Sequence, residues 1–220
     1  MRKLTGAVFI SLDGVMQAPG GPDEDPTSNF RFGGWVQPFW DEHMGPFEKV
    51  IMGEYDLLLG KRTYDIFAAY WPYNQDNPIG TKFQHINKYV LTHSNEPLGW
   101  DNSSKLSGGT AEAVAELKKS DGRDLLIQGS STLYAPLLSA GLIDELVLMT
   151  FPVLLGRGKR IFDGSETPGA LKLVDHFVSK TGVVTGTYEP AGEVPTGTFE
   201  TKPPSEAELE RRESWARADA

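Results

Sequence analysis

A turn of small polar residues, 129–132, follows the apolar run 125–127 and precedes an amphipathic helical pattern. A second apolar strand is predicted at residues 145–151. The turn would then lie inside a βαβ unit, at a helix N-terminus where free backbone N–H groups and the helix dipole attract phosphate. It matches neither the Walker loop nor the GxGxxG fingerprint, and the alternative interpretation is a simple connection with a serine cap.

A second candidate anion site is the string 60–63, which follows the buried run 56–60. Gly60 permits a tight turn, and Thr63 is predicted to cap the next helix. Lys61 and Arg62 supply positive charge for an anion. The alternative is an ordinary helix start with solvated basic residues, because short strings of this kind are common.

Two further strand ends carry polar side chains. Thr92 and His93 follow the strand pattern KYVLT, and ligands of open α/β sheets bind beyond the carboxyl ends of the strands. An adenosine phosphate would suit this position, although Thr92 and Ser94 could simply cap a turn. Asp13 ends the first strand; its carboxylate is either catalytic or holds the turn that the Asp-Gly pair signals.

Alternating strands and helices are predicted to position these turns. We expect strands at 3–12, 56–60, 88–92, 125–127 and 145–151, a strand or loop pair at 98–106, and helices within 35–52, at 63–69 and at 110–119, the last capped by Thr110. Residues 171–179 and 183–188 are expected to form a hairpin. The pattern predicts an α/β fold: a mainly parallel sheet covered by helices on both faces and completed by the antiparallel hairpin.

Composition limits the possible functions. Hydrophobic residues at 39% and charged residues at 23% are typical of a globular protein. The absence of cysteine excludes disulfides and cysteine nucleophiles, and the net charge of -9 argues against general nucleic-acid binding. The four histidines show no ligand spacing, so no metal site is expected. No apolar run is long enough to span a membrane, and we expect a cytoplasmic protein.

The composition changes after Pro190. Residues 1–190 are predicted to form one domain, and residues 191–220 a Pro/Gly-rich linker followed by a charged helical tail. Ser205 and Glu208 have the spacing of a capping box at the start of that tail helix.

Together these segments resemble the dihydrofolate reductase-like superfamily, in particular the reductase domain of the bifunctional riboflavin-biosynthesis deaminase–reductase and its stand-alone relatives. The matching strings cover residues 2–190 in order: SLDG, GGW, LLLGKRTY, FAAYWP, KYVLT, LLIQGSSTL, LLSAGLIDEL and PVLLGRGKRIF. The resemblance implies a three-layer α/β/α fold, reductase activity without the deaminase, and a homodimer.

The resemblance also implies NADPH as the cofactor. The adenosine 2′-phosphate would lie near Lys61, Arg62, Thr63, Thr92 and His93, after Gly60. The pyrophosphate would lie on Gly129, Ser130, Ser131, Thr132 and Leu133, and the nicotinamide near Phe9, Val15 and Met16. Family members usually carry arginine where this chain has Lys61, and lysine lacks the bidentate fork that favours a phosphate.

On the substrate side, the resemblance implies a ribosylaminopyrimidine phosphate held by Asp13, Arg31, Trp35 and Arg157, with Asp13 as the candidate catalytic residue. Folate-reducing relatives place a carboxylate on the first helix, where this chain has Met44, flanked by Asp41, Glu42 and Glu48. The favoured reaction is reduction of 5-amino-6-(5-phosphoribosylamino)uracil. The alternatives are a dihydrofolate or pterin reductase and a non-catalytic NADP-binding protein.

Overall fold

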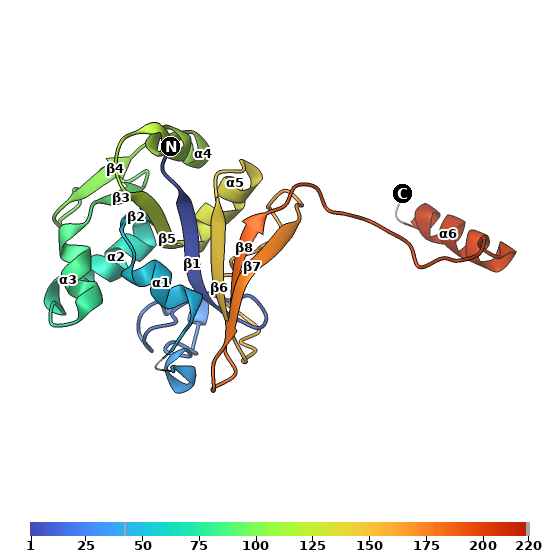
Figure 1. The fold of residues 1–220 in the computed structure, drawn as a ribbon, viewed down its shortest axis with the longest axis horizontal. Coiled ribbons are helices and arrows are strands. Elements are labelled where there is room, and N and C mark those ends of the chain that lie inside the picture. Colours follow the sequence, from blue (N-terminus) through green and yellow to red (C-terminus); the bar gives the residue numbers. More distant parts are fainter. Residues whose placement is uncertain (42, 219–220) are drawn as a thin grey trace.

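The structure, a computed structural model, describes residues 1–41 and 43–218. The strands form one eight-stranded sheet, and helices α1 to α5 cover its two faces (Figure 1). The sheet order is β4-β3-β2-β5-β1-β6-β8-β7. The strands β4, β3, β2, β5, β1 and β6 pair in parallel, and β8 and β7 complete the sheet as an antiparallel hairpin. Their bounds are β1 (Leu4–Ser11), β2 (Tyr55–Gly60), β3 (Lys88–Leu91), β4 (Ser103–Leu106), β5 (Asp124–Gly129), β6 (Glu145–Phe151), β7 (Leu171–Val178) and β8 (Val184–Pro190).

The helices connect the parallel strands. They are α1 (Pro46–Met52), α2 (Lys61–Tyr70), α3 (Pro78–His85), α4 (Thr110–Lys119) and α5 (Tyr134–Ser139), with α6 (Glu206–Ala218) in the tail. Short 3-10 turns lie at Thr27–Asn29, Gln37–Phe39, Trp71–Tyr73 and Ser131–Leu133. The predicted α/β class, the mainly parallel sheet and the terminal hairpin are therefore confirmed.

Alternation along the strands produces two cores, because successive side chains point to opposite faces of a sheet. Leu57 and Leu59 of β2 pack with residues of α1, α2 and α3, whereas Leu58 packs with residues of α4 and α5. The strands that are buried on both faces read as nearly continuous apolar runs, as expected for parallel strands between two helical layers. The chain therefore folds as three layers, α/β/α.

Several predicted boundaries were wrong, for local reasons. The helix expected within residues 35–52 is a 3-10 turn followed by the short α1, which begins after Gly45 at φ 62°. Gly109, not Thr110, occupies the N-cap of α4. Helix α3 was not predicted, although Asn77 caps it by accepting a hydrogen bond from the Ile79 N–H (2.9 Å) and Pro78 occupies its first turn.

The tail after β8 consists of an extended segment and α6, which runs away from the sheet (Figure 1). The Ser205 hydroxyl accepts a hydrogen bond from the Glu208 N–H (3.3 Å), which is half of the predicted capping box. The Glu208 carboxylate instead pairs with Arg211 and Arg212. Within residues 1–41 and 43–218, no helix has the length and apolar character needed to cross a bilayer.

A buried lysine supports the start of β3. Lys88 is 0% exposed, and its ammonium donates to the carbonyls of Phe83 (2.6 Å) and Ile86 (2.9 Å). The same Nζ lies 4.3 Å from the centre of the Trp100 ring. Burial lowers the pKa of Lys88 to about 8, against the opposing effect of Asp101 and Asp56.

This pKa predicts how stability depends on pH. Between pH 8 and 10.5 the unfolded chain holds a proton that folded Lys88 lacks, so the free energy of unfolding rises with pH there. Lys88→Met should remove this rise, and wild type should gain on the order of 1 to 2 kcal/mol over the variant between pH 8 and 9.5. Urea unfolding of both proteins measures the difference. Lys119→Met, at an exposed lysine, is the control; parallel pH curves for wild type and Lys88→Met would contradict the prediction.

Candidate functional site

The carboxyl ends of the six parallel strands lie along one edge of the sheet, and the predicted site residues gather there. Gly60, at the end of β2, is in register with Leu91 of β3, and Leu59 is in register with Gly129 of β5. On the other side of β5, Ser11 of β1 is in register with Phe151 of β6. Segments separated by up to 140 residues in the sequence therefore meet at one carboxyl edge.

The Gly60 and Gly129 turns are in direct contact. A side chain on Gly60 would collide with Ser130, and a Cβ on Gly129 would lie 2.5 Å from the Thr63 hydroxyl. The Ser130 hydroxyl accepts a hydrogen bond from the Thr63 N–H (3.4 Å) and lies 3.2 Å from the Thr63 hydroxyl. The predicted capping role of Thr63 is therefore wrong: α2 begins at Lys61 with Gly60 as its N-cap, and Thr63 lies inside the helix.

The helix after the Gly129 turn is short. A 3-10 turn, Ser131–Leu133, leads into the six-residue α5, and the Leu133 N–H already donates to the Ser130 carbonyl at 3.1 Å. Ser130 and Ser131 are partly exposed, and Thr132 is exposed.

Both cations of the Gly60 string are paired with carboxylates. The Lys61 ammonium donates to both Asp65 oxygens (2.7 and 2.9 Å) and lies 3.8 Å from Glu96 Oε2. The hydrogen bonds that Lys61 donates to Asp65 raise the pKa of Lys61. Arg62 points to the long loop after β1, where it donates to the Thr27 hydroxyl (3.0 Å) and to Asp25 (3.4 Å). The predicted anion site thus carries its own negative charges.

A cation that was not predicted, Lys105, lies next to the end of β3. Thr92 is partly exposed and His93 exposed, directly after the strand. Lys105 of β4 is in register with Val90, and its ammonium donates to the Ser94 carbonyl (3.1 Å). A lysine in an outer strand could have indicated this cation, but the pairing of β4 with β3, which brings Lys105 here, could not be inferred from the sequence.

The Asp13 carboxylate holds the segment after β6. Its Oδ1 accepts hydrogen bonds from the Ser11 hydroxyl (2.6 Å) and the Leu155 N–H (3.1 Å), and its Oδ2 accepts one from the Gly156 N–H (2.8 Å). Arg160 also contacts it. Partial burial would raise the pKa of Asp13, but these hydrogen bonds outweigh it and hold the pKa at about 2. These contacts match the alternative in which the Asp13 carboxylate holds the turn.

A second ionic cluster joins the long loop to residues 156–160. Asp25 is buried and binds the Lys159 ammonium and the Thr27 hydroxyl (2.5 Å). Burial would raise the pKa of Asp25, but the hydrogen bonds from Lys159 and Thr27 lower it. Neither Lys159 nor Asp25 was among the predicted site residues.

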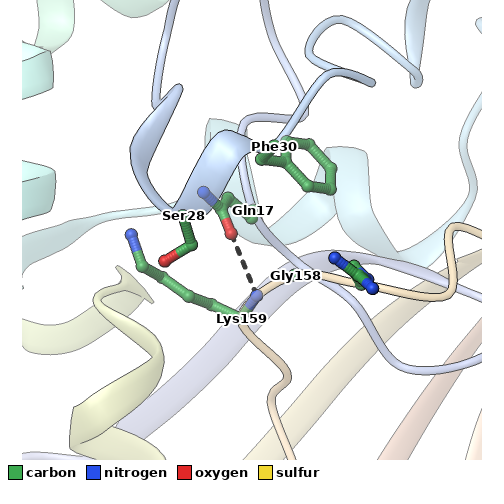
Figure 2. A pocket seen from close by; sticks show the side chains of 6 residues that line it. Gln17, Ser28, Phe30, Gly158 and Lys159 are labelled. Atoms are coloured by element: carbon green, nitrogen blue, oxygen red, sulfur yellow. Dashed lines mark hydrogen bonds between the residues drawn. The ribbon is translucent and has the colours of Figure 1, made fainter.

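A pocket of about 230 Å³ opens beside this cluster (Figure 2). Its lining residues are Gln17, Ser28, Phe30, Arg157, Gly158 and Lys159. The Gln17 side chain accepts a hydrogen bond from the Lys159 N–H (3.1 Å) and donates to the carbonyls of Asp25 and Thr27 (both 3.0 Å). Arg157, predicted to bind substrate, therefore lies at a real pocket, between the loop and the Gly-rich segment.

Some predicted contact residues have no exposed side chain. Val15 and Leu133 are buried, and the Trp35 indole is buried with its N–H donating to the Gln17 carbonyl (2.8 Å). Phe9 and Met16 remain partly exposed, and Arg31 is exposed. Of the predicted nicotinamide contacts, Phe9 and Met16 therefore keep accessible side chains.

The carboxylates near α1 are engaged with backbone groups. Asp41 accepts a hydrogen bond from the Lys180 N–H (3.0 Å), and Glu48 accepts one from the Met44 N–H (2.8 Å). Glu42 lies outside the described residues. Among the described residues there is no cluster of three or more histidine or carboxylate groups suited to a metal ion.

The Asp13 contacts predict a loss of stability rather than a purely catalytic defect. Asp13→Asn would present an NH₂ group to a backbone N–H, so the midpoint of urea unfolding should fall by an amount corresponding to about 1 to 3 kcal/mol. Because the pKa of Asp13 is lowered, its contribution is present above pH 4 and lost as the pH falls towards 2. Wild-type stability should therefore fall more steeply than that of Asp13→Asn in this range. Asp23→Asn, in the same loop, is the control; unchanged stability with lost turnover would instead assign Asp13 to catalysis.

Comparison with known proteins agrees with this architecture. The chain is 29% identical to the uncharacterized protein YyaP of Bacillus subtilis (strain 168) over 137 residues, 60% of this chain and 72% of that protein. A protein of Shewanella sp. PV-4 with a provisional riboflavin-biosynthesis name superposes with a TM-score of 0.66 at 21% identity, covering 87% of this chain and 99% of that one. Dihydrofolate reductase from Enterococcus faecalis, solved with NADP(H), superposes with a TM-score of 0.51 at 17% identity, covering 86% and 96%.

These superpositions show that the fold is dihydrofolate reductase-like. The family model of the RibD C-terminal domain matches residues 2–185. That stretch contains the whole carboxyl edge, from Asp13 to the Gly-rich segment 156–160. The chain therefore belongs to the RibD C-terminal domain family.

Proposed function

We propose that this chain is a cytoplasmic NADPH-dependent reductase that transfers hydride to a small heterocyclic or ribosylamino-pyrimidine substrate. The family supports a reductase role. The observation that carries the proposal is the meeting of the Gly60, Thr92 and Gly129 turns on the adjacent strands β2, β3 and β5. Ligands of open α/β sheets bind at this kind of edge, and one extended dinucleotide would contact all three turns.

The groups at this edge fit a dinucleotide. Gly60 and Gly129 carry no side chain, and the hydroxyls of Ser130 and Thr63 occupy the space where the two turns touch. The hydroxyls of Ser130, Ser131 and Thr132 would hold the pyrophosphate, and Lys61, Thr92 and His93 would face the adenosine phosphate. When bound, the nicotinamide supplies hydride from its C4 carbon. Phe9 and Met16 would give the ring an apolar surface that excludes water.

The proposed substrate is 5-amino-6-(5-phosphoribosylamino)uracil. Arg157 lines the pocket beside Lys159 and has no ion pair with any described residue. An arginine without a carboxylate partner suits a phosphate, which it binds through two parallel N–H groups. Arg31, exposed on the same loop system, is a second candidate for the phosphate.

Two measurements test the function. NADPH should raise the melting temperature, because a ligand that binds only the folded state stabilises it. The pyrimidine substrate should accelerate NADPH oxidation.

Arg157→Ala should raise the KM for that substrate by roughly tenfold or more with little change in kcat, because a hydrogen bond to a charged group is lost. The matched control is Arg123→Ala, which changes an exposed arginine directly before β5, at the amino ends of the parallel strands.

Each alternative has its own outcome in these assays. Oxidation of NADPH with dihydrofolate but not with the pyrimidine would identify a folate reductase. The engagement of Asp41 and Glu48 by backbone groups gives that alternative little support. Binding of NADPH without acceleration by either substrate would identify a non-catalytic NADP-binding protein. If neither NADPH nor NADP protects the chain, the dinucleotide proposal is wrong.

We also propose a homodimer that pairs through β7. This outer strand has apolar side chains at Leu171, Leu173, Val174 and Val178 that are all exposed, whereas the opposite outer strand, β4, is mostly polar. An exposed apolar edge strand favours pairing with another strand.

Sedimentation should give twice the monomer mass for wild type and the monomer mass for Val174→Lys, with Ser104→Lys on β4 as the control. A monomeric wild type would contradict this assembly.

A further inference from the structure

The cation that faces the proposed adenosine end of the cofactor is neutralised within the fold. Lys61 is the first residue of α2, and its ammonium holds both oxygens of Asp65, one helical turn further on. Glu96, in the loop after β3, lies 3.8 Å from the same ammonium. One positive charge thus faces two negative charges.

The remaining cations nearby do not reverse this balance. Arg62 is turned to Asp25 and Thr27, on the other side of the Gly60 turn. Lys105 donates to the Ser94 carbonyl and has no ion pair with any described residue. The side chains of Asp65 and Glu96 are 54% and 78% exposed, so both carboxylates are accessible to a ligand that approaches Lys61.

NADP and NAD differ at the group that would meet these side chains. NADP carries a phosphate on the adenosine 2′-oxygen, and NAD carries a hydroxyl there. In dinucleotide-binding folds a carboxylate at this position accepts a hydrogen bond from the ribose hydroxyl, whereas a basic residue accommodates the phosphate. A carboxylate close to the 2′-phosphate repels it, and one bound to the lysine also competes for the lysine's N–H donors.

We propose that Asp65 and Glu96 are specificity-determining residues that limit the preference of this protein for NADP over NAD. They do so by occupying Lys61 and by repelling a 2′-phosphate, while leaving a ribose hydroxyl undisturbed. This inference rests on the proposed function, because it requires a nicotinamide dinucleotide at the carboxyl edge. It concerns the cofactor end of the site, at the ends of β2 and β3, and leaves the substrate pocket unaffected.

Direct binding of NADP⁺ and NAD⁺ tests the proposal without turnover. Isothermal titration gives the ratio of the two dissociation constants for wild type, Asp65→Asn, Glu96→Gln and the double variant. Each single substitution should shift the ratio towards NADP⁺ by roughly threefold to fivefold, and the pair by on the order of tenfold, as exposed ion pairs permit. The shift should come from tighter NADP⁺ binding, and it should shrink at high salt, where exposed charges are screened.

Two further variants make the result specific. Glu116→Gln removes an equally exposed, ion-paired carboxylate from α4 and should leave the ratio unchanged. Lys61→Met in the double-variant background should abolish the gain, because no ammonium is left for the phosphate. Circular dichroism should give the same spectrum for all variants, since the substituted side chains are largely exposed or lie at the surface of α2.

The outcomes separate this inference from the proposed function. If both dinucleotides bind and the ratio for the double variant stays within twofold of wild type, Asp65 and Glu96 do not determine specificity, and the reductase proposal stands. A shift towards NAD⁺ overturns the inference in the same way. If wild type and every variant bind neither dinucleotide, the proposed function is wrong and the inference falls with it.

Discussion

The site depends on the close approach of two turns at positions where each turn has a glycine, which lacks a side chain. Gly60 ends β2 and Gly129 ends β5, and neither tolerates a Cβ because Ser130 and Thr63 fill the space between them. This contact brings the N-terminus of α2 against the Gly129 turn, so that hydroxyl groups from two separate βα units share one surface. A larger residue at either glycine would separate the two units and divide the predicted dinucleotide surface.

Electrostatic pairing then fixes the segments that surround this contact. Asp13 fastens residues 155 and 156 to the end of β1, and Asp25 fastens the long loop to Lys159 and Arg62. Buried or partly buried carboxylates with several donors are stable only while those donors remain in place. The protein has net negative charge, yet most cations of the carboxyl edge are used internally, which leaves Arg157, Arg31 and Lys105 as the least engaged.

The sequence predicts the strands well and the side-chain network poorly. Apolar runs such as residues 57–59 and 125–127 identify buried strands, and alternation with helices identifies the sheet class. The pairing of Lys61 with Asp65 was readable, since residues four apart share a helix face. The contact of Asp25 with Lys159 was not, because 134 residues separate them and no local pattern links the two. Similarly, Gly45 and Pro46 shorten α1 in a way that periodicity alone does not reveal.

The exposure of Asp65 and Glu96 has a consequence for the evolution of this protein. Neither side chain belongs to the two apolar cores, so replacing either one alters the charge at the end of β2 without disturbing the packing of the sheet. Most substitutions at such surface positions change folding stability by less than about 0.5 kcal/mol. Under the proposed function, descendants of this chain can therefore vary their preference between NADP and NAD while keeping the same fold.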